Sequence, residues 1–404
     1  MSSNSGSKEK KAPSSLASKG KTAIDIETFG GEEPSVVGAF DVEGDELELN
    51  LSTSKSDPQW DAFLKRTGAG HHLQTSLWAQ AKAMLKWEAV RIIATMNQRI
   101  AGGAQILYRS VIPRVRVAYI TKGPVVDRAH PELVKVILQK SIEACRSLHA
   151  RVVVVQPPNT DQSLVSLLPE LGFDRTSLEL APSASVLIDL SRPIEEILNE
   201  MKRQTRQNIR RSEREGIVIR EGEEKDIELF YRFHLTTSKR QGFVPYPKEY
   251  FTQMWQVFGP SDSIKLFIAE YLNDPVSALL VIPFGDTAVP KIFGWSGRYP
   301  EKRPNEAVFW GAMLWAKTHG YGLFDLEGID RDGASAVLRG DPLPEPLHHS
   351  PDFFKIGFGG KIVLYPEAYR KVSGRMLRWI CRTADPKLGS DNIPSRIVDY
   401  LRKR

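Results

Sequence analysis

The sequence predicts a mixed α/β protein built from two similar domains, and three observations lead to that prediction. First, 404 residues exceed one ordinary hydrophobic core, so two domains of about 150 to 200 residues are expected. Second, each half contains an antiparallel hairpin pattern, and Ala94 corresponds to Ala269 at an offset of about 175 residues. Third, Leu-Gly-Phe at 171–173 corresponds to Ile-Gly-Phe at 356–358. Such a recurrence indicates the internal duplication of one α/β unit.

The first domain is predicted to span residues 49–181. Residues 1–48 are rich in Ser, Gly, Lys and Glu with hardly any periodic apolar pattern, so we expect a disordered arm there. From residue 49 onward, helical spacing of apolar residues predicts helices, and runs of β-forming residues predict strands, with a turn at 97–99. The helices are expected at 57–67, 76–87 and 131–149, the hairpin at 90–110, and further strands at 114–126 and 151–158.

The second domain is predicted to span residues 182–372 and to repeat this order. Its hairpin is expected at 264–286, with the turn at Asn273-Asp274-Pro275. Helices are expected at 227–243 and 306–320, and later strands at 289–297 and 321–329. The run FFKIGFGG at 353–360, taken alone, reads as a buried closing strand that enters a tight glycine turn, with its lysine extending to water.

This order of helical start, antiparallel hairpin, long strand, helix and strand resembles the acyltransferase fold of the GNAT superfamily, present here twice. Members of that superfamily that use acetyl-CoA usually carry a loop of the type Arg/Gln-x-x-Gly-x-Gly/Ala after the fourth strand, where backbone N–H groups hold the pyrophosphate. Neither corresponding loop, at 121–134 or at 294–309, contains this pattern. Acetyl-CoA is therefore not the expected donor, and no cofactor is predicted.

Charge and cysteine content further limit the partners and the kinds of site that the sequence predicts. The net charge is +6, and the stretch from Pro366 to Arg404 holds ten Lys/Arg against four Asp/Glu, so residues 373–404 are predicted to form a basic extension. Such an end suits an anionic partner, namely RNA, a phosphorylated substrate or a membrane surface, or else forms a solvated helix. Cys145 and Cys381 match no metal or disulfide spacing, so neither kind of site is expected. With no membrane-spanning run and no secretory signal, the protein is expected in the cytoplasm.

A strongly basic helix is predicted between the two domains, from Met201 to Gly216. It carries six Lys/Arg within thirteen positions, and the glycine ends it. This density favours contact with phosphates over a solvated inter-domain helix. The candidate nucleic-acid-binding residues are Lys202, Arg203, Arg206, Arg210, Arg211 and Arg214.

Six separated segments together resemble the Fem-type aminoacyltransferases, the FemABX family that builds peptidoglycan cross-bridges. They are QTSLWAQAK at 74–82, KGPVVD at 122–127, the basic helix at 201–217, SKRQGF at 238–243, GWSGR at 294–298 and FKIGFGG at 354–360. The resemblance implies transfer of an aminoacyl group from a charged tRNA to an amine of the stem peptide of a peptidoglycan precursor, which is either nucleotide-linked or lipid-linked. It also implies two domains that flank a cleft. The coiled-coil arm of the longer members is not evident here.

The resemblance also implies roles for single residues. Lys355, in the FKxGFGG motif, is expected beside the oxyanion that forms during transfer, or on substrate phosphates, because a fixed cation there lowers the barrier. Lys82 and Arg240 are expected on the phosphates of the precursor. Tyr246 and Trp295 correspond to aromatic positions that face the substrate, and Tyr246 is equally consistent with a place in the core.

Asp127 matches an acidic position near the cleft of the family. It either orients the attacking amine or caps the next helix. Two histidine pairs, His71-His72 and His348-His349, fall in predicted loops, where such pairs are usually solvated. Because no nucleophilic constellation stands out, direct attack by the substrate amine is a simpler prediction than a covalent acyl-enzyme.

Two other functions stay open from the sequence. In one, the tRNA-dependent chemistry acts on an acceptor outside peptidoglycan; in the other, the chain is a non-catalytic binding protein of the same fold. The segment at 368–382 mixes Met376, Leu377, Trp379 and Ile380 with arginines, so it is either an interfacial helix at a membrane or a docked C-terminal helix. The amino acid transferred and the oligomeric state are left undetermined.

Overall fold

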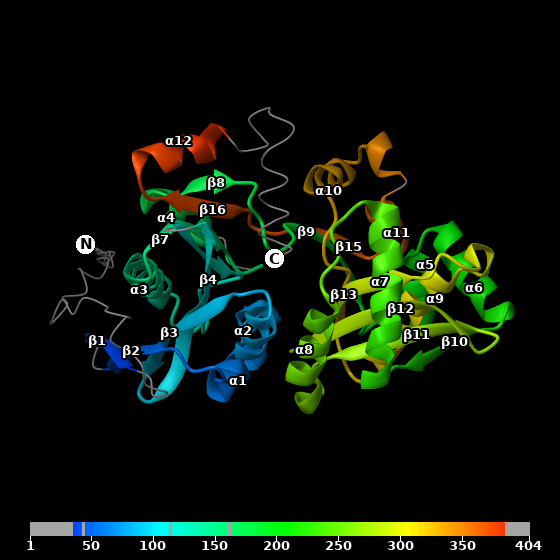
Figure 1. Ribbon diagram of the computed structural model, residues 1–404, viewed down its shortest axis with the longest axis horizontal. Coiled ribbons are helices and arrows are strands. Elements are labelled where there is room, and N and C mark those ends of the chain that lie inside the picture. Colours follow the sequence, from blue (N-terminus) through cyan, green and yellow to red (C-terminus); the bar gives the residue numbers. More distant parts are fainter. Residues whose placement is uncertain are drawn as a thin grey trace, which may run out of the picture.

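The computed structural model describes residues 35–42, 45–112, 115–159, 161, 163–348 and 350–383. Two β-sheets covered by helices make up the two halves of the molecule in Figure 1. The predicted mixed α/β architecture in two units is therefore confirmed. Residues 1–34 and 384–404, which hold most of the predicted N-terminal arm and of the basic C-terminal extension, lie outside the described residues, as does His349.

The first half forms helices and strands close to the predicted positions. Its strands are β1 (Ser35–Val42), β2 (Asp45–Ser52), β3 (Glu88–Met96), β4 (Arg99–Ile112), β5 (Val115–Thr121), β6 (Val125–Val126), β7 (Ala150–Gln156) and β8 (Asp174–Thr176). Its helices are α1 (Pro58–Arg66), α2 (Ser76–Ala83), α3 (Leu133–Ser147) and α4 (Ser163–Glu170). Side-chain caps fix two of the starts, because Asp57 accepts from the amide of Trp60 and Thr75 accepts from the amide of Trp78.

From Ala184 onward, the chain adds eight strands and eight helices among the described residues. The strands are β9 (Ala184–Asp189), β10 (Ile217–Glu221), β11 (Lys265–Tyr271), β12 (Asp274–Phe284), β13 (Thr287–Trp295), β14 (Leu323–Asp325), β15 (Lys361–Leu364) and β16 (Ala368–Val372). The helices are α5 (Ile194–Glu200), α6 (Arg203–Arg214), α7 (Ile227–Gln241), α8 (Lys248–Phe258), α9 (Pro304–Thr318), α10 (Arg331–Leu338), α11 (Pro351–Gly357) and α12 (Arg375–Thr383).

The recurring hairpin that indicated a duplication is confirmed. β3 and β4 are joined through Asn97 and Gln98, and β11 and β12 are joined through Leu272 and Asn273. All four turn residues have a positive φ. Two consecutive left-handed residues match the twist of the flanking strands in a two-residue hairpin, so the two turns are built alike.

The two sheets exchange strands. The hydrogen-bonded order is β1-β2-β3-β4-β5-β7-β16-β8 in the first sheet and β10-β11-β12-β13-β14-β9-β15 in the second. β16 lies antiparallel between β7 and β8, and it appears in red within the first half in Figure 1. β9, which comes after β8 in the sequence, lies between β14 and β15 of the second sheet. The predicted end of the second domain at residue 372 is therefore wrong, because β16 completes the first sheet.

The predicted disordered arm at residues 1–48 is also wrong in its last part. β1 and β2 form an antiparallel hairpin, and β2 pairs with β3 at the edge of the first sheet. Leu47, Leu49 and Leu51 alternate along β2 and are buried in the core. This period of two is the signal of a half-buried strand. The sequence prediction missed this hairpin because the alternating pattern is short and the segment before it is polar.

The run FFKIGFGG does not form the predicted closing strand. Residues 351–357 form α11, which begins at Pro351 after a cap in which Ser350 accepts from the amide of Asp352. Gly359 and Gly360 come next with positive φ and lead into β15. A Cβ on Gly359 would lie 2.5 Å from the carbonyl oxygen of Glu200, so the close approach that these glycines permit is to the protein's own chain.

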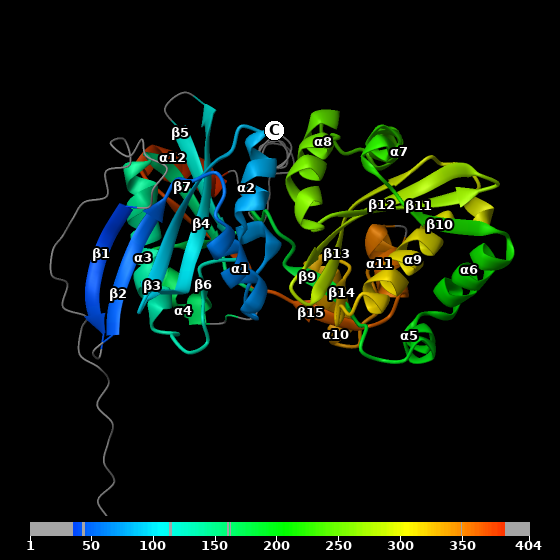
Figure 2. The same cartoon turned by 90° about the horizontal axis from the view of Figure 1, so that it is seen from below.

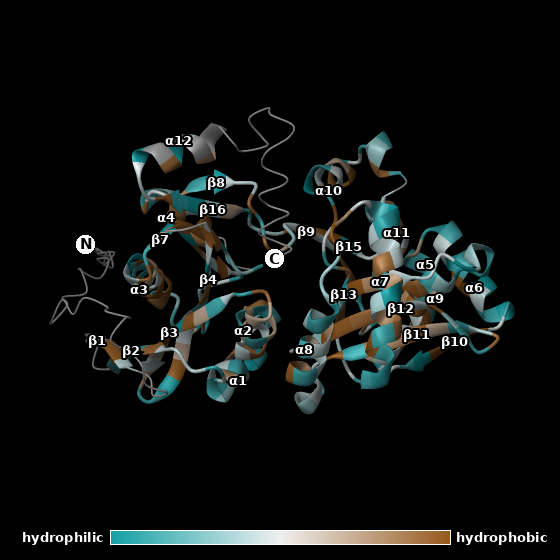
Figure 3. Ribbon diagram, in the orientation of Figure 1, coloured by the Kyte–Doolittle hydropathy of each residue, from teal (hydrophilic) through white to brown (hydrophobic). Residues whose placement is uncertain are grey.

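A continuous hydrophobic cluster joins the two halves. It combines Trp78 and Leu107 of the first half with Phe230, Tyr250 and Leu280 of the second. Figure 2 shows α2 and α8 facing each other where the halves meet, and Figure 3 shows hydrophobic residues along the strands. The two halves therefore share a core as well as exchanging strands.

Candidate functional site

Lys355 lies in the last turn of α11, with its side chain held against the loop after β14. Its Nζ donates to the carbonyl oxygens of Glu327 and Gly328, both at 2.6 Å. Burial lowers the pKa of this amine, and the nearby carboxylates oppose that shift. Phe354 and Phe358 pack against Phe309 beside it. The amine of Lys355 is therefore held by the backbone and is not the water-exposed side chain that the isolated motif suggests.

The charges of Glu327, Asp325 and Lys291 act on Lys355, and the same three charges act on Lys122. We call Lys122, Lys291, Lys355, Asp325 and Glu327 the amine–carboxylate cluster. Both carboxylate oxygens of Glu327 accept from Lys291 Nζ at 2.7 Å. Lys122, at the end of β5 in the first half, donates to the carbonyl of Pro182 at 3.2 Å, and burial lowers its pKa to about 8. The cluster thus draws on both halves of the molecule.

Asp325 ends β14 and is 7 % exposed. Its carboxylate accepts from Ser185 Oγ, from Tyr365 Oη at 3.1 Å and from the amide of Glu327 at 2.9 Å. Burial raises its pKa, and these hydrogen bonds oppose the change. Because the ring of Tyr365 also lies 4.8 Å from Lys122 Nζ, this tyrosine links the carboxylate to the amine of the other half.

The divergence of two parallel strands makes room for the cluster. β13 and β14 pair through only two residues of each strand, Thr287 with Leu323 and Ala288 with Phe324. The matching strands β5 and β7 pair through six residues of each strand, with one register shift between Arg116 and Val117. Beyond the short pairing, Lys291 of β13 reaches across to Glu327, so an ion pair bridges the gap where hydrogen bonds between strands end. The second sheet is therefore split between β13 and β14, at a place where the strands of the first sheet stay paired.

A cavity of about 370 Å³ lies next to the cluster, between the two halves. One wall is the loop from Gly68 to His72, and the other is the face of the second sheet that carries Leu187, Val289, Asp325 and Tyr365. His71 and His72 line it, and burial holds the pKa of both well below its usual range. His72 is 1 % exposed, so the prediction of a solvated pair is wrong here: tertiary packing places the second half over this loop.

Lys82 and Tyr246, both predicted to bind substrate, are brought together across the interface. The Lys82 amine lies 4.8 Å from the ring centre of Trp78, 5.5 Å from that of Tyr246 and 5.0 Å from that of Tyr250. Burial, with Lys291 and Arg109 nearby, lowers the pKa of Lys82 to about 7. Its positive charge is therefore held among aromatic faces, which attract cations.

Arg240 and Trp295 form a second such pair. The guanidinium of Arg240, at the end of α7, stacks 4.2 Å from the ring centre of Trp295, at the end of β13. Trp295 Nε1 donates to the carbonyl of Arg298 at 3.1 Å, which fixes the ring. Arg240 is exposed, so its N–H groups remain open to an anion.

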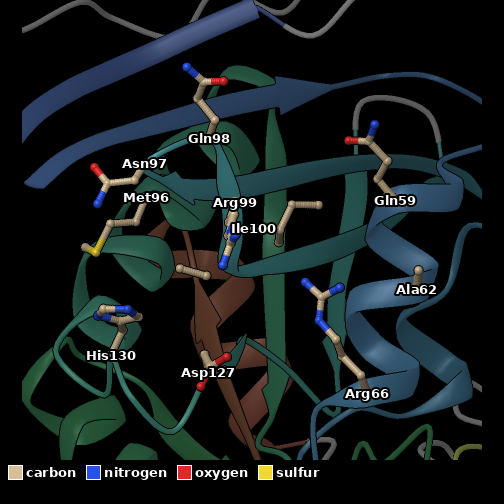
Figure 4. A pocket seen from close by; sticks show the side chains of 11 residues that line it. Gln59, Ala62, Arg66, Met96, Asn97, Gln98, Arg99, Ile100, Asp127 and His130 are labelled. Atoms are coloured by element: carbon tan, nitrogen blue, oxygen red, sulfur yellow. The ribbon is translucent and has the colours of Figure 1, made fainter.

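Asp127 lies elsewhere. It lines a separate cavity of about 980 Å³ with Arg66, Arg99 and His130, and Figure 4 shows these side chains around it. Its carboxylate accepts from the amide of Ala129 at 3.0 Å, which caps a turn rather than the first turn of α3. None of the described residues lines both this cavity and the interdomain cavity. The structure thus places Asp127 away from the interdomain cavity.

The basic helix α6 lies on the outer side of the second half, where it packs on α9, and not between the halves (Figures 1 and 2). Its six cations differ in their surroundings. Arg206 donates to the carbonyl oxygens of Leu198 and Asn199 at the end of α5, and Arg211 pairs with Glu215. The Lys202 amine lies 4.4 Å from the ring centre of Phe353. Arg203, Arg210 and Arg214 are exposed, and the charge of Arg214 contributes to lowering the pKa of Glu215.

Four members of the cluster were not predicted from the sequence. Lys122 opens the segment KGPVVD, and Asp325 and Glu327 belong to the predicted strand at 321–329. Lys291 lies in β13 where the pairing with β12 shifts in register between Pro290 and Ile292. A charged residue inside each β-rich run was the available signal, but only tertiary structure shows that these charges meet.

The described residues offer neither a metal-binding cluster nor a membrane-spanning helix. Within those ranges, no group of three or more His, Cys, Asp or Glu side chains is arranged to hold a metal ion. In the same part of the chain, no helix combines the length and apolar character that a bilayer crossing requires.

Comparisons with known proteins agree with this architecture. The model of the FemAB family matches residues 55–166 and 159–274. A lipid II:glycine glycyltransferase of Staphylococcus aureus (strain MRSA252) is 24% identical over 227 residues, which are 53% of this chain and 54% of that protein. The chain thus matches about half the length of this relative.

Solved structures share the fold of both halves, with matches that cover 80% and 81% of this chain. A crystal structure of FemX superposes with a TM-score of 0.70 at 18% identity, covering 80% of this chain and 97% of that one. A tandem GNAT protein from the clavulanic acid biosynthesis pathway gives a TM-score of 0.50 at 10% identity, covering 81% and 99%. The predicted tandem GNAT-like fold is confirmed by these likenesses.

Proposed function

Because this chain belongs to the FemAB family, we propose that it is an aminoacyltransferase that carries an amino acid from aminoacyl-tRNA to an amine of a peptidoglycan-precursor stem peptide. The name of the matching relative, a lipid II:glycine glycyltransferase, supports a peptidoglycan acceptor. The observation that carries the proposal is the amine–carboxylate cluster, in which two backbone carbonyls hold the amine of Lys355 in place.

The reaction needs a stabilised oxyanion more than it needs a nucleophile from the protein. The acceptor nitrogen attacks the ester carbonyl carbon, the C–N bond forms, the C–O bond to the ribose breaks, and the proton of the amine ends on the ribose oxygen. An ammonium has three N–H donors, and Lys355 uses two of them on carbonyl groups. The third can donate to the oxyanion in a site from which water is largely excluded. The ester is already activated, so the proposal requires no cofactor.

The precursor would lie across the interface between the halves. Arg240 with Trp295, and Lys82 with Tyr246, present cations and aromatic faces there, and both the nucleotide-linked and the lipid-linked precursor carry phosphates that such cations bind. Lys82 binds an anion in its protonated form. With its pKa lowered to about 7, that form is partly lost at neutral pH until a phosphate restores it.

The test of this function is transfer in vitro. Purified protein is mixed with tRNA charged with one labelled amino acid at a time and with either the soluble or the lipid-linked muropeptide. We expect label in one acceptor from one amino acid. Absence of label in both acceptors, with tRNA still bound, would point to an acceptor outside peptidoglycan and would overturn the assignment.

The exposed arginines of α6 are the proposed contacts to the tRNA. Changing Arg203, Arg210 and Arg214 together to Glu should raise the KM for charged tRNA by about tenfold or more at about 0.15 M salt. It should also flatten the dependence of affinity on salt, because each lost phosphate contact removes a released counterion. Filter binding and transfer kinetics at several salt concentrations measure both effects.

Two control variants test whether the effect on tRNA binding is specific to the exposed arginines of α6. Reversal of three exposed lysines of the first half makes the same change in net charge and should leave the salt dependence unchanged; they are Lys55, Lys65 and Lys135. Arg206→Met should lower stability instead, because it removes the bonds to Leu198 and Asn199. If the lysine variant weakens tRNA binding as much as the arginine variant, α6 has no special role.

We further propose that α12 rests on an anionic membrane surface, which places the enzyme on the cytoplasmic side. Trp379 is 66% exposed and stands next to the exposed Arg378, while Leu377 and Cys381 pack toward the core. An aromatic ring beside a cation suits the headgroup region. Of the predicted segment, the side chains of Met376 and Ile380 lie outside the described residues.

Co-sedimentation with vesicles tests this contact. The protein should pellet with vesicles that contain phosphatidylglycerol at low salt and much less with purely phosphatidylcholine vesicles. Trp379→Ser should reduce the bound fraction several-fold, whereas Leu272→Ser, at a residue 80% exposed on a distant turn, should not. Equal pelleting with both vesicle types, or none at low salt, removes the proposal.

A further inference from the structure

Asp127 lines a second cavity, which the proposed transfer reaction does not use. Its volume of about 980 Å³ is near the upper limit of small-molecule sites, which are about 300 to 1,000 Å³. Three segments of the first half form its walls, namely one face of α1, the turn between β3 and β4, and the loop after β6. Because it lies at the β3–β4 hairpin, we call it the hairpin cavity.

Two arginines line the hairpin cavity from two different elements. Gln59, Ala62 and Arg66 follow one another at intervals of three and four residues, which puts them on one face of α1. Arg99 begins β4, directly after the turn that joins this strand to β3. Both arginines are exposed. The cavity therefore receives one cation from a helix and one from a strand.

Asp127 is held in the wall of the cavity by its own backbone. Its amide donates to the carbonyl of Ala101 in β4 at 2.8 Å, and its carbonyl accepts from the amide of His130 at 3.0 Å. Figure 4 shows the side chain of Arg66 extending from α1 toward the space between Arg99 and Asp127. Two cations and one carboxylate thus border the same space.

These three side chains keep hydrogen-bonding groups available. Among the described residues, the guanidiniums of Arg66 and Arg99 have no hydrogen-bond or ion-pair partner. Oδ1 of Asp127 accepts from the amide of Ala129, and within the same ranges Oδ2 has no donor. A guanidinium only donates and a carboxylate only accepts. A ligand that satisfies all three groups therefore carries an anion and, on the same molecule, an O–H or N–H donor.

We propose that the hairpin cavity binds a phosphate monoester of a hydroxylated molecule, such as a mononucleotide or a sugar phosphate, with the phosphate on Arg66 and Arg99 and a hydroxyl group on Asp127. A phosphate monoester has three strong acceptor oxygens, so it can accept from two guanidiniums at once. Met96 and Ile100 supply apolar surface for the rest of the ligand. This site is independent of the proposed aminoacyl transfer.

Calorimetric titration of the full chain with four probes tests this site. The probes are ribose 5-phosphate, adenosine 5′-monophosphate, its 2′,3′-dideoxy analogue, which lacks the ribose hydroxyl groups, and adenosine, which lacks the phosphate. Adenosine 5′-monophosphate should bind about tenfold or more tightly than adenosine, because hydrogen bonds between charged groups are the strong ones. It should also bind more tightly than the dideoxy analogue, and ribose 5-phosphate, which carries both groups, should bind too.

Substitutions assign each contact. Arg66→Gln and Arg99→Gln should each weaken the monophosphate by about tenfold and leave adenosine unchanged. Asp127→Asn keeps an oxygen for the amide of Ala129 and replaces the other oxygen with an N–H donor, so the advantage over the dideoxy analogue should disappear. The control is Arg151→Gln, at an exposed arginine of β7 in the same sheet, which should change no affinity.

A variant at the interface separates this site from the proposed precursor site. Arg240→Gln removes the cation proposed for the phosphates of the precursor and should leave binding of the monophosphate unchanged. If Arg240→Gln abolishes that binding and Arg66→Gln does not, the nucleotide binds at the interface and the hairpin cavity is not its site.

Three other results would also overturn the assignment. They are equal affinity for the monophosphate and adenosine, no binding of any probe at millimolar concentration, and equal losses in Arg151→Gln and the two cavity arginine variants. The proposed transfer function would survive all three, because none of these arginines takes part in it. Conversely, failure of both muropeptides to accept label would leave the hairpin cavity site intact.

Discussion

Replacing Lys355 with Met should lower kcat/KM for aminoacyl transfer by about 100-fold to 1,000-fold, the usual effect of removing one donor to an oxyanion. Methionine keeps much of the length and apolar stem but carries no N–H. The third donor of the Lys355 ammonium is the group proposed to meet the oxyanion, because the other two bind Glu327 and Gly328. Steady-state transfer with saturating tRNA measures the change, and tRNA affinity should be unaffected.

A control substitution at another lysine of the second half distinguishes a loss of catalysis from a loss of stability. Lys317 also donates to two backbone carbonyls, those of Leu190 and Arg192, both at 2.7 Å, but it stands outside the cluster. Lys317→Met should cost a similar amount of stability, about 1 to 3 kcal/mol, and keep most of the activity. Comparable activity losses in the two variants would mean that Lys355 acts only by holding its loop.

Removal of β16 should unfold the first sheet even though β16 belongs to the C-terminal end of the chain. A chain that ends at Pro366 lacks this strand, whereas a chain that ends at Gly374 keeps it and lacks α12 and the residues beyond that helix. β16 fills the position between β7 and β8, and Tyr369 and Val372 are buried there. Burial of such side chains contributes about 1.5 to 3 kcal/mol each, and every orphaned backbone group costs about 1 to 3 kcal/mol.

These losses are comparable to the whole stability of a domain, about 5 to 15 kcal/mol. Denaturant titration should therefore show a cooperative transition for the longer chain and none at native-like stability for the shorter one. Hydrogen exchange locates the damage, because β7 should lose protection first. If the shorter chain unfolds at the same denaturant concentration as the longer one, the exchanged strand does not hold the first sheet together.

Local patterns were sufficient for much of the fold. The period of two along each hairpin and the turn residues at Asn97 and Asn273 predicted both β-meanders, and helical spacing predicted α3, α7 and α9. The duplication could be inferred from the recurrence of these patterns. Local signals also misled, because FFKIGFGG has the composition of a strand, whereas Ser350 and Pro351 begin a helix there.

The candidate site was predicted in part. Lys355 with its motif came from sequence resemblance, as did the substrate-facing roles of four single residues, Lys82, Arg240, Tyr246 and Trp295. Only the structure shows that Lys82 lies beside Tyr246 and Arg240 beside Trp295. Asp127 was expected near the cleft, but the loop after β6 carries it to a different cavity. A residue's place in a motif does not fix the direction in which its loop turns.

The sequence by itself determined the two α/β units, their hairpins, the basic helix and the lysine of the FKxGFGG motif, because each depends on residues close together in the chain. Tertiary structure alone decided the exchange of β9 and β16, the meeting of Lys122 with Asp325, and the burial of His71 and His72. These features join residues that are far apart in the chain. Their stability comes from packing and long-range strand pairing, which leave no periodic trace in the sequence.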